Sequence, residues 1–250
     1  MRYIELEKIN NVSVIRICRP EKLNALNKDL WLSLREVLSR ECSEDSIGIV
    51  LTGCERAFSS GDDIREMYEL RTLEESQRFF ELLGSVAKIL MLCEKPVVAA
   101  VNGLAVGGGA EILMIADYVI ATRDAWFSFP EASLGLIPPL LLSVGTDLFN
   151  TKLCKKLALS SQRISVDEAT RLGLVDEVVD NKDQLINRAI EVARTIYSST
   201  SREVVSLVKK MIYARYIDFL DQNLKELSKL VLSEFAKKKM RDFLEKRHKK

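Results

Sequence analysis

Short apolar runs set the fold of this 250-residue chain, because each is too short for a helix and long enough for a strand. They lie at residues 47–52, 97–101 and 118–121. Unbroken apolar runs of this kind are typical of strands buried on both faces of a sheet. Residues 28–40 precede the first run, and residues 64–93 lie between the first and second runs. Both segments have apolar residues at helical spacing. The alternation of buried strands with helices predicts an α/β fold.

The two ends of the chain have different patterns. Residues 3–8 and 12–17 are rich in β-formers and predict a hairpin. Beyond about residue 150 the pattern predicts helices only, with Ser165 capping one of them. We therefore expect a core over residues 1–190 and a helical C-terminal region over residues 191–250. The helices expected beyond residue 150 lie at 152–159, 167–172, 182–198 and 202–240.

Charge, histidine and cysteine content exclude several classes of function. The 37 Lys and Arg nearly balance 36 Asp and Glu, which argues against a nucleic-acid partner. The single histidine, His248, lies near the end of the chain, so a His-based triad or a multi-His metal site is not expected. The five cysteines lack zinc-site spacing and are interpreted as reduced core thiols. We expect no metal.

Targeting and membrane signals are also missing from the pattern. Residues 1–8 alternate charged and apolar side chains and lack the apolar stretch of a secretory signal. No apolar run approaches the roughly 20 residues that span a bilayer. We therefore expect a cytoplasmic protein without a membrane partner.

Two glycine-rich turns are the first candidates for chemistry. Residues 59–63 follow the run at 47–52, and residues 107–111 follow the run at 97–101 and begin a helix expected to reach about residue 116. Ligands bind at the carboxyl ends of strands in open α/β sheets, where amides at helix starts are free donors. Either turn alone is more typical of a plain tight turn. Together they predict two N–H groups aimed at one oxygen, an oxyanion hole.

Without a usable histidine, proton transfer would fall to carboxylates, Lys, Tyr or Cys. Glu111 lies at the helix start of the second turn among apolar neighbours, and Glu131 follows Pro130 and Phe129. Apolar surroundings raise a carboxyl's pKa, which lets it hold a proton near neutral pH. Each glutamate alone has a simpler interpretation, a helix-dipole partner for Glu111 and a solvated loop residue for Glu131.

The turns and glutamates fall within five blocks that follow one another along the chain. The blocks are RPEKLNALN at 19–27, AFSSGDDI at 57–64, KPVVAAVNG at 95–103, GGGAE at 107–111 and FSFPEASLG at 127–135. In this order they resemble the enoyl-CoA hydratase/isomerase family, the crotonase superfamily, over nearly the whole chain. The resemblance implies an α/β, crotonase-like spiral of ββα units with a helical C-terminal trimerisation region. It also implies a homotrimer or a dimer of trimers.

The resemblance implies an acyl-CoA thioester as ligand, with coenzyme A as part of the substrate and no separate cofactor. The oxyanion hole would be the backbone N–H groups of Asp62 and Gly108. Glu111 would act as base on the attacking water, and Glu131 would deliver a proton to C2. Phe243 and Lys246 resemble residues that close over CoA from a neighbouring subunit. The substrate-binding residues implied for the CoA moiety are Lys22, Ala25, Ser60, Phe243 and Lys246.

The resemblance also gives a role to a basic run at the C-terminus. Residues 237–250 contain eight Lys and Arg against Asp242 and Glu245, a net charge of +6. By charge alone this run is a solvated tail, whereas the resemblance implies attraction of the CoA phosphates.

Two departures from the family pattern stand out. The oxyanion position, where a small or neutral residue is usual, carries Asp62, whose carboxylate must point away from developing negative charge. The segment at 137–143 reads IPPLLLS, and Pro139 has no N–H to donate at a point where hydratases make a backbone bond. The leucines of this segment would also reshape the acyl pocket.

The residues and the resemblance together predict an enoyl-CoA hydratase that adds water reversibly to a trans-2-enoyl-CoA. The first alternative is a Δ3,Δ2-enoyl-CoA isomerase, which typically keeps only the second glutamate, so Glu111 favours the hydratase. Further alternatives are an acyl-CoA hydrolase or decarboxylase, a non-catalytic acyl-CoA binder and an RNA-binding relative.

Overall fold

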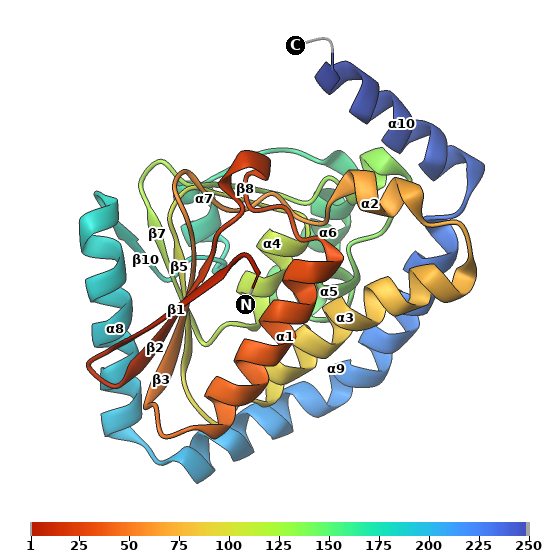
Figure 1. Ribbon diagram of the computed structural model, residues 1–250. Helices are drawn as coiled ribbons and strands as arrows, with labels where there is room; N and C mark the ends of the chain where they lie inside the picture. Colours follow the sequence, from red (N-terminus) through yellow and green to blue (C-terminus); the bar gives the residue numbers. More distant parts are fainter. Residues whose placement is uncertain (1, 249–250) are drawn as a thin grey trace.

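Two β-sheets hold the strands of the protein (Figure 1). The computed structural model describes residues 2–248, with side chains through Lys246. The larger sheet has six strands in the order β1-β2-β3-β5-β7-β10, and the smaller has four in the order β4-β6-β8-β9. The larger sheet contains β1 (Ile4–Ile9), β2 (Val12–Ile17), β3 (Gly48–Gly53), β5 (Val97–Val101), β7 (Tyr118–Thr122) and β10 (Glu177–Val179). The smaller sheet contains β4 (Ala57–Ser59), β6 (Leu104–Val106), β8 (Trp126–Ser128) and β9 (Ile164–Ser165).

Three successive repeats build the spiral. In each, one strand joins the larger sheet, the next joins the smaller sheet, and a helical segment follows. The pairs are β3 with β4, β5 with β6 and β7 with β8, and strands from successive repeats are parallel. The predicted hairpin of β1 and β2 extends the larger sheet at its edge. The expected α/β spiral of ββα units is confirmed.

Helices cover both faces of the larger sheet (Figure 1). One face packs against α8 (Lys182–Ser199), and the other faces the main core with α1 (Lys28–Ser43) and α3 (Leu73–Leu92). The long α9 (Arg202–Leu230) runs along α3, and α10 (Glu234–His248) follows it. The remaining helical segments are α2 (Ile64–Glu69), α4 (Gly108–Glu111), α5 (Pro139–Ser143), α6 (Gly145–Ser160), α7 (Val166–Arg171), η1 (Pro20–Lys22), η2 (Ile112–Ile115) and η3 (Glu131–Leu134).

Several boundaries differ from the sequence expectation. The helix expected at 64–93 is two helices, because Thr72 starts α3 with a capping box to Glu75. The helix expected at 202–240 is likewise divided into α9 and α10. The C-terminal part is not helical only, since the short strands β9 and β10 lie beyond residue 150. The division expected at residue 190 falls inside α8, whose buried face packs on the sheet.

The cysteines correct another expectation. Cys18 is bonded to Cys54 and Cys42 to Cys93, with Cα–Cα distances of 5.1 and 5.4 Å, and only Cys154 is a free thiol among the described residues. The interpretation of all five as reduced thiols was therefore wrong. Both pairs are distant in sequence and become neighbours only when β2, β3, α1 and α3 pack together.

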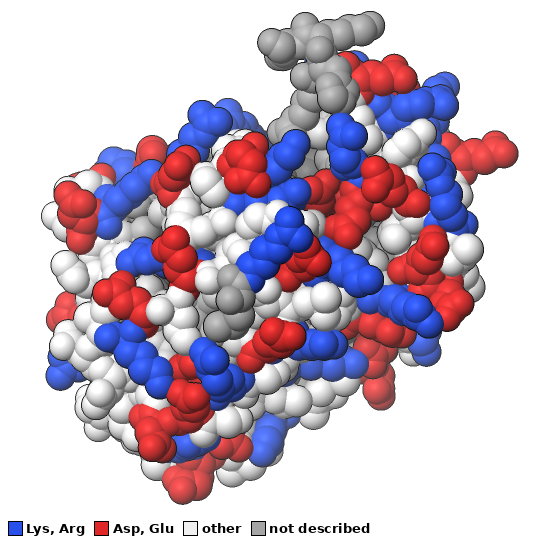
Figure 2. All heavy atoms as spheres, viewed as in Figure 1, with Lys and Arg blue, Asp and Glu red and all other residues white. Residues whose placement is uncertain are grey.

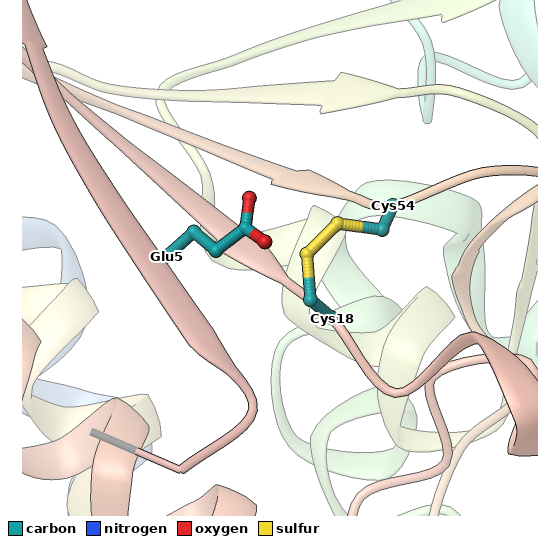
Figure 3. A group of neighbouring side chains, drawn as sticks. All are labelled: Glu5, Cys18 and Cys54. Atoms are coloured by element: carbon teal, nitrogen blue, oxygen red, sulfur yellow. A yellow bond between two sulfur atoms is a disulfide. The ribbon is translucent and has the colours of Figure 1, made fainter.

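The first disulfide also bears on metal binding. Figure 3 shows the Cys18–Cys54 bond with Glu5 beside it, and potential ligand atoms of the three residues lie within 4.8 Å of one another. The two sulfurs are bonded to each other, so this group offers a metal one carboxylate and no thiolate.

The surface and the helices give two further observations. Figure 2 shows Lys and Arg intermixed with Asp and Glu over the viewed face. Among the described residues, no helix combines the length and apolar character needed to span a bilayer. The side chain of His248, and those of the basic run beyond Lys246, lie outside the described residues.

Candidate active site

The two glycine-rich turns meet at the carboxyl ends of β4 and β6. Gly61 has a φ of +82°, and an added Cβ there would lie 2.7 Å from the carbonyl oxygen of Val106 and 3.4 Å from the nitrogen of Gly108. Only glycine combines this backbone conformation with such a close approach. The expectation that the turns lie side by side is thus confirmed by direct backbone packing.

The amides of Asp62 and Gly108 lie on either side of this contact. Asp62 follows Gly61, and Gly108 is the first residue of α4. Within the described residues, neither N–H donates to a backbone carbonyl. Both residues line one cavity, so an oxygen bound there would lie beside these two N–H groups.

Glu111 is held by a contact that the sequence did not reveal. The backbone N–H groups of Leu140 and Leu141 donate to its Oε1 at 2.7 and 2.8 Å. These are orphan donors of the first turn of α5, and Pro139 occupies the first position of that helix, where an N–H has no helical partner. Pro139 has no N–H to donate. The N–H groups of the next two residues, Leu140 and Leu141, donate the backbone hydrogen bonds at this point instead.

Glu131 has very different surroundings. It begins η3, and its Oε2 is buried with no hydrogen-bond partner among the described residues. The carboxyl lies over Gly107, since an added Cβ on that glycine would be 3.0 Å from Oε1. Burial raises the pKa of the Glu131 carboxyl to about 8. At neutral pH Glu131 therefore holds a proton.

Burial, and then the charge of Glu131, also raise the pKa of Glu111 above its ordinary value. Two carboxyls buried in one cavity disfavour each other's ionised form. Two amide donors favour the ionised form of Glu111, whereas Glu131 has an unpaired oxygen. Of the two carboxyls, Glu111 is therefore the one whose surroundings better accept a negative charge.

Asp62 adds a third carboxyl to the site. Its Oδ1 accepts a 2.8 Å hydrogen bond from the indole Nε1–H of Trp31 in α1, and an added Cβ on Gly108 would lie 3.3 Å from its Oδ2. One oxygen of this carboxyl is thus held by α1 and the other lies near Gly108, so its direction relative to a bound thioester oxygen stays a prediction. Burial raises the pKa of Asp62 to about 7, so much of it is neutral at that pH.

An apolar cavity extends from these polar groups. Glu111, Glu131, Asp62 and the turn glycines line it together with apolar side chains. The apolar residues are Ile64, Met67, Phe80, Val106, Pro130, Leu134, Leu136, Ile137, Pro139 and Leu227. The leucines at 140–142 do not line it, although they were expected to reshape it.

A second, larger hollow adjoins this cavity and shares Ser60, Asp62 and Ile64 with it. Of the residues expected to bind CoA, Lys22, Ala25, Ser60 and Phe243 line this hollow, and Lys246 is exposed outside the lining. Phe243 belongs to the same chain as the rest of the hollow, whereas the resemblance implied a neighbouring subunit.

Lys237, the first basic residue of the C-terminal run, binds backbone carbonyls of its own chain. Lys237 Nζ donates to the carbonyl oxygens of Met67, Tyr68 and Leu70 at 3.0, 2.9 and 2.6 Å. These carbonyls end α2, so Lys237 joins α10 to the helix that carries Ile64 and Met67. No sequence pattern indicated this contact.

Buried polar contacts hold the loop between β2 and α1 against the first turn. The Arg19 guanidinium forms a 2.6 Å ion pair with Asp63, and both side chains are largely buried. Asn24 donates to the carbonyl oxygens of Cys54 and Ala57 at 3.1 and 2.7 Å. Ser60 Oγ donates to the carbonyl oxygen of Lys22 at 3.1 Å. These residues fix the backbone from which the Asp62 amide projects.

Comparisons with known proteins identify the family of this chain. A family model described as enoyl-CoA hydratase/isomerase matches residues 7–250. The chain is 42% identical over 201 residues to a short-chain-enoyl-CoA hydratase of Clostridium acetobutylicum, covering 78% of this chain and 75% of that protein. It is 35% identical over 250 residues to a mitochondrial enoyl-CoA hydratase of Pongo abelii, covering 96% of this chain and 83% of that protein.

The fold agrees as well. The crystal structure of an enoyl-CoA hydratase from Bacillus halodurans superposes with a TM-score of 0.87 at 26% identity, covering 96% of this chain and 99% of that one. The family model spans nearly the whole described chain, and both relatives exceed 30% identity over most of it. The chain belongs to the enoyl-CoA hydratase/isomerase family.

Proposed function

We propose that this protein is an enoyl-CoA hydratase, which adds water reversibly across the C2=C3 bond of a trans-2-enoyl-CoA. The proposal rests on two carboxyls that line one cavity. Two amides donate to Glu111, Oε2 of Glu131 has no partner, and the N–H groups of Asp62 and Gly108 lie beside them and donate to no backbone carbonyl among the described residues. The relatives named as hydratases support the same reaction. Coenzyme A enters as part of the substrate, and the reaction uses no separate cofactor or metal.

The proposed mechanism begins with the thioester oxygen held by the N–H groups of Asp62 and Gly108. Ionised Glu111 takes a proton from water, and the water oxygen bonds to C3. The C2=C3 electron pair moves toward the carbonyl, giving an enolate that the two N–H donors stabilise. Protonated Glu131 then gives its proton to C2. Exchange of a proton between the carboxyls and solvent restores the starting state.

The isomerase alternative needs only one base to move a proton between C2 and C4. Glu131 alone would serve that reaction, and it would leave the two amide donors on Glu111 without a role. The orientation of Glu111 by Leu140 and Leu141 therefore favours the hydratase.

Replacing each glutamate tests these roles. We expect Glu111→Gln and Glu131→Gln each to lower kcat for crotonyl-CoA hydration by about 10²–10⁴-fold, because each loses one proton transfer. Binding of butanoyl-CoA, measured by calorimetry, should change little. Ser133→Ala, in the same 3₁₀ turn as Glu131, is the matched control and should keep its turnover. A fully active Glu111→Gln would contradict the assigned role of that residue.

A trimer of this chain is part of the proposal. One face of α9 buries Tyr213, Tyr216 and Leu220 in its own chain. Its opposite face exposes a row of apolar side chains that a monomer would leave in water, a feature typical of an interface. The exposed residues are Val204, Leu207, Val208, Met211, Ile212 and Phe219. A second copy of the chain is the proposed partner.

Cytoplasmic location stays a prediction. The two disulfides weigh against it, because disulfides are uncommon in reducing compartments.

A further inference from the structure

The acyl cavity is small and closed on one side by apolar side chains. The volume inside this cavity that the centre of a water-sized sphere can occupy is about 50 Å³. A water needs roughly 10–15 Å³ by this measure, so the cavity has space for roughly three to five groups of that size. Met67, Phe80 and Leu227, which form part of its wall, are all buried.

A separate groove lies on the other side of one wall residue. It has about 360 Å³ of room by the same measure and lies between α3 and α9. Gly84, Leu224 and Ser228 line it, with the Lys88–Asp221 ion pair at 2.6 Å in its wall. Phe80 is the one residue, in the described part of the chain, that lines both this groove and the acyl cavity.

The packing of Phe80 keeps it in place as a partition. The side chain is 1% exposed, and its ring meets that of Phe79 edge-on, with centroids 5.2 Å apart and planes at 89°. Helix α9 packs closely behind it, because Gly84 leaves room for Leu224, whose Cδ1 would lie 2.5 Å from an added Cβ. A buried ring between two close helices has little freedom to rotate aside.

We propose that Phe80 limits the substrate to short acyl chains of about four carbons by separating the acyl cavity from the α3–α9 groove. The inference rests on the proposed function and narrows its substrate class. The carbons of a four-carbon chain fit the available room, whereas a longer chain meets the ring of Phe80. Removing the ring joins the cavity to the groove, and the extra carbons of a long chain then have space.

The test compares four- and eight-carbon substrates. Wild-type kcat/KM should fall by about 100-fold or more from the four-carbon to the eight-carbon trans-2-enoyl-CoA. Phe80→Ala should raise kcat/KM for the eight-carbon substrate by about tenfold or more and lower it for the four-carbon one. Phe80→Leu, which disturbs packing less, should shift the ratio in the same direction.

Phe149→Ala is the matched control. It removes a buried ring of the same size from α6, and Phe149 lines neither hollow. Its ratio of eight- to four-carbon activity should equal that of the wild type, with thermal unfolding recorded for each variant. An equal shift in Phe149→Ala would show general loosening and overturn the proposal. So would a wild type that uses both chain lengths equally.

Binding separates this inference from the proposed function. Calorimetry with saturated butanoyl-CoA and octanoyl-CoA should show the same preference and the same response to Phe80→Ala, without any reaction. If no enoyl-CoA is hydrated, the proposed function fails, and the binding ratio still decides the role of Phe80. Equal affinity of the wild type for both thioesters would overturn the partition.

Discussion

At the scale of single residues, the site depends on contacts that bring side chains from distant segments to one carbonyl group. Glu111 and Glu131 could be proposed from their apolar neighbours in the sequence. Their different hydrogen bonding could not, because the amides of α5 reach Glu111 from a distant segment and Oε2 of Glu131 has no partner among the described residues. The bond from Trp31 to Asp62 was equally hidden, since 31 positions separate the two residues.

Asp62 leads to a prediction about pH. Its neutral form is compatible with an enolate beside it, whereas its ionised form repels that charge. As pH rises through about 7, Asp62 loses its proton and turnover should fall. Asp62→Asn cannot ionise, so its activity should persist until Glu131 loses its proton at about pH 8. Profiles of kcat from about pH 6 to about pH 9 measure the difference.

Asp29→Asn, at an exposed carboxylate of α1, is the control for that profile. It should leave the alkaline limb where the wild type has it. Identical profiles for the wild type and Asp62→Asn would show that the charge of Asp62 does not reach the reacting atoms.

Among the secondary-structure elements, the strands formed by continuous apolar runs could be predicted from the sequence. The short strands, which form only by pairing with neighbouring strands, could not. Strands β3, β5 and β7 were predicted because their runs are continuous and buried. Strands β4, β6, β8 and β10 have only three residues each and carry no periodic signal. The meeting of the two turns was predictable, because carboxyl ends of parallel strands lie at one edge of a sheet.

The contact of α10 with α2 gives a prediction at this scale. Lys237→Met removes three hydrogen bonds that join the two helices, so Phe243 and Leu244 should leave the hollow beside Lys22. We expect KM for crotonyl-CoA to rise by about tenfold, the effect of losing hydrogen bonds to a charged group. Turnover at saturation should change less, since the glutamates stay in place.

Lys238→Met is the matched control, because this neighbouring lysine is exposed. It changes charge equally and should leave KM near the wild-type value at moderate salt. Equal increases in KM for both variants would indicate that the charge of the run, and not the helix contact, governs binding.

At the scale of the whole molecule, the resemblance implied assembly through the C-terminal helices, and the exposed face of α9 supports it. Met211 and Leu207 are 74% and 59% exposed in the single chain. We expect the protein to be a trimer or a dimer of trimers by light scattering. Charged side chains are depleted from the cores of such interfaces, so Leu207→Glu with Met211→Glu should give monomers.

Leu159→Glu provides the comparison, because Leu159 is 71% exposed and belongs to α6 instead of α9. It should leave the assembly unchanged. A wild-type protein that is monomeric at micromolar concentration would contradict the proposed interface.

We propose that two glutamates and two backbone amides hydrate an enoyl thioester. Incubation of the wild-type protein with crotonyl-CoA in water enriched in heavy oxygen tests for this reaction. Mass spectrometry should find 3-hydroxybutanoyl-CoA with one heavy oxygen at C3. Unchanged crotonyl-CoA, together with conversion of a 3-enoyl-CoA to its 2-enoyl isomer without label, would contradict the claim and assign the site to an isomerase.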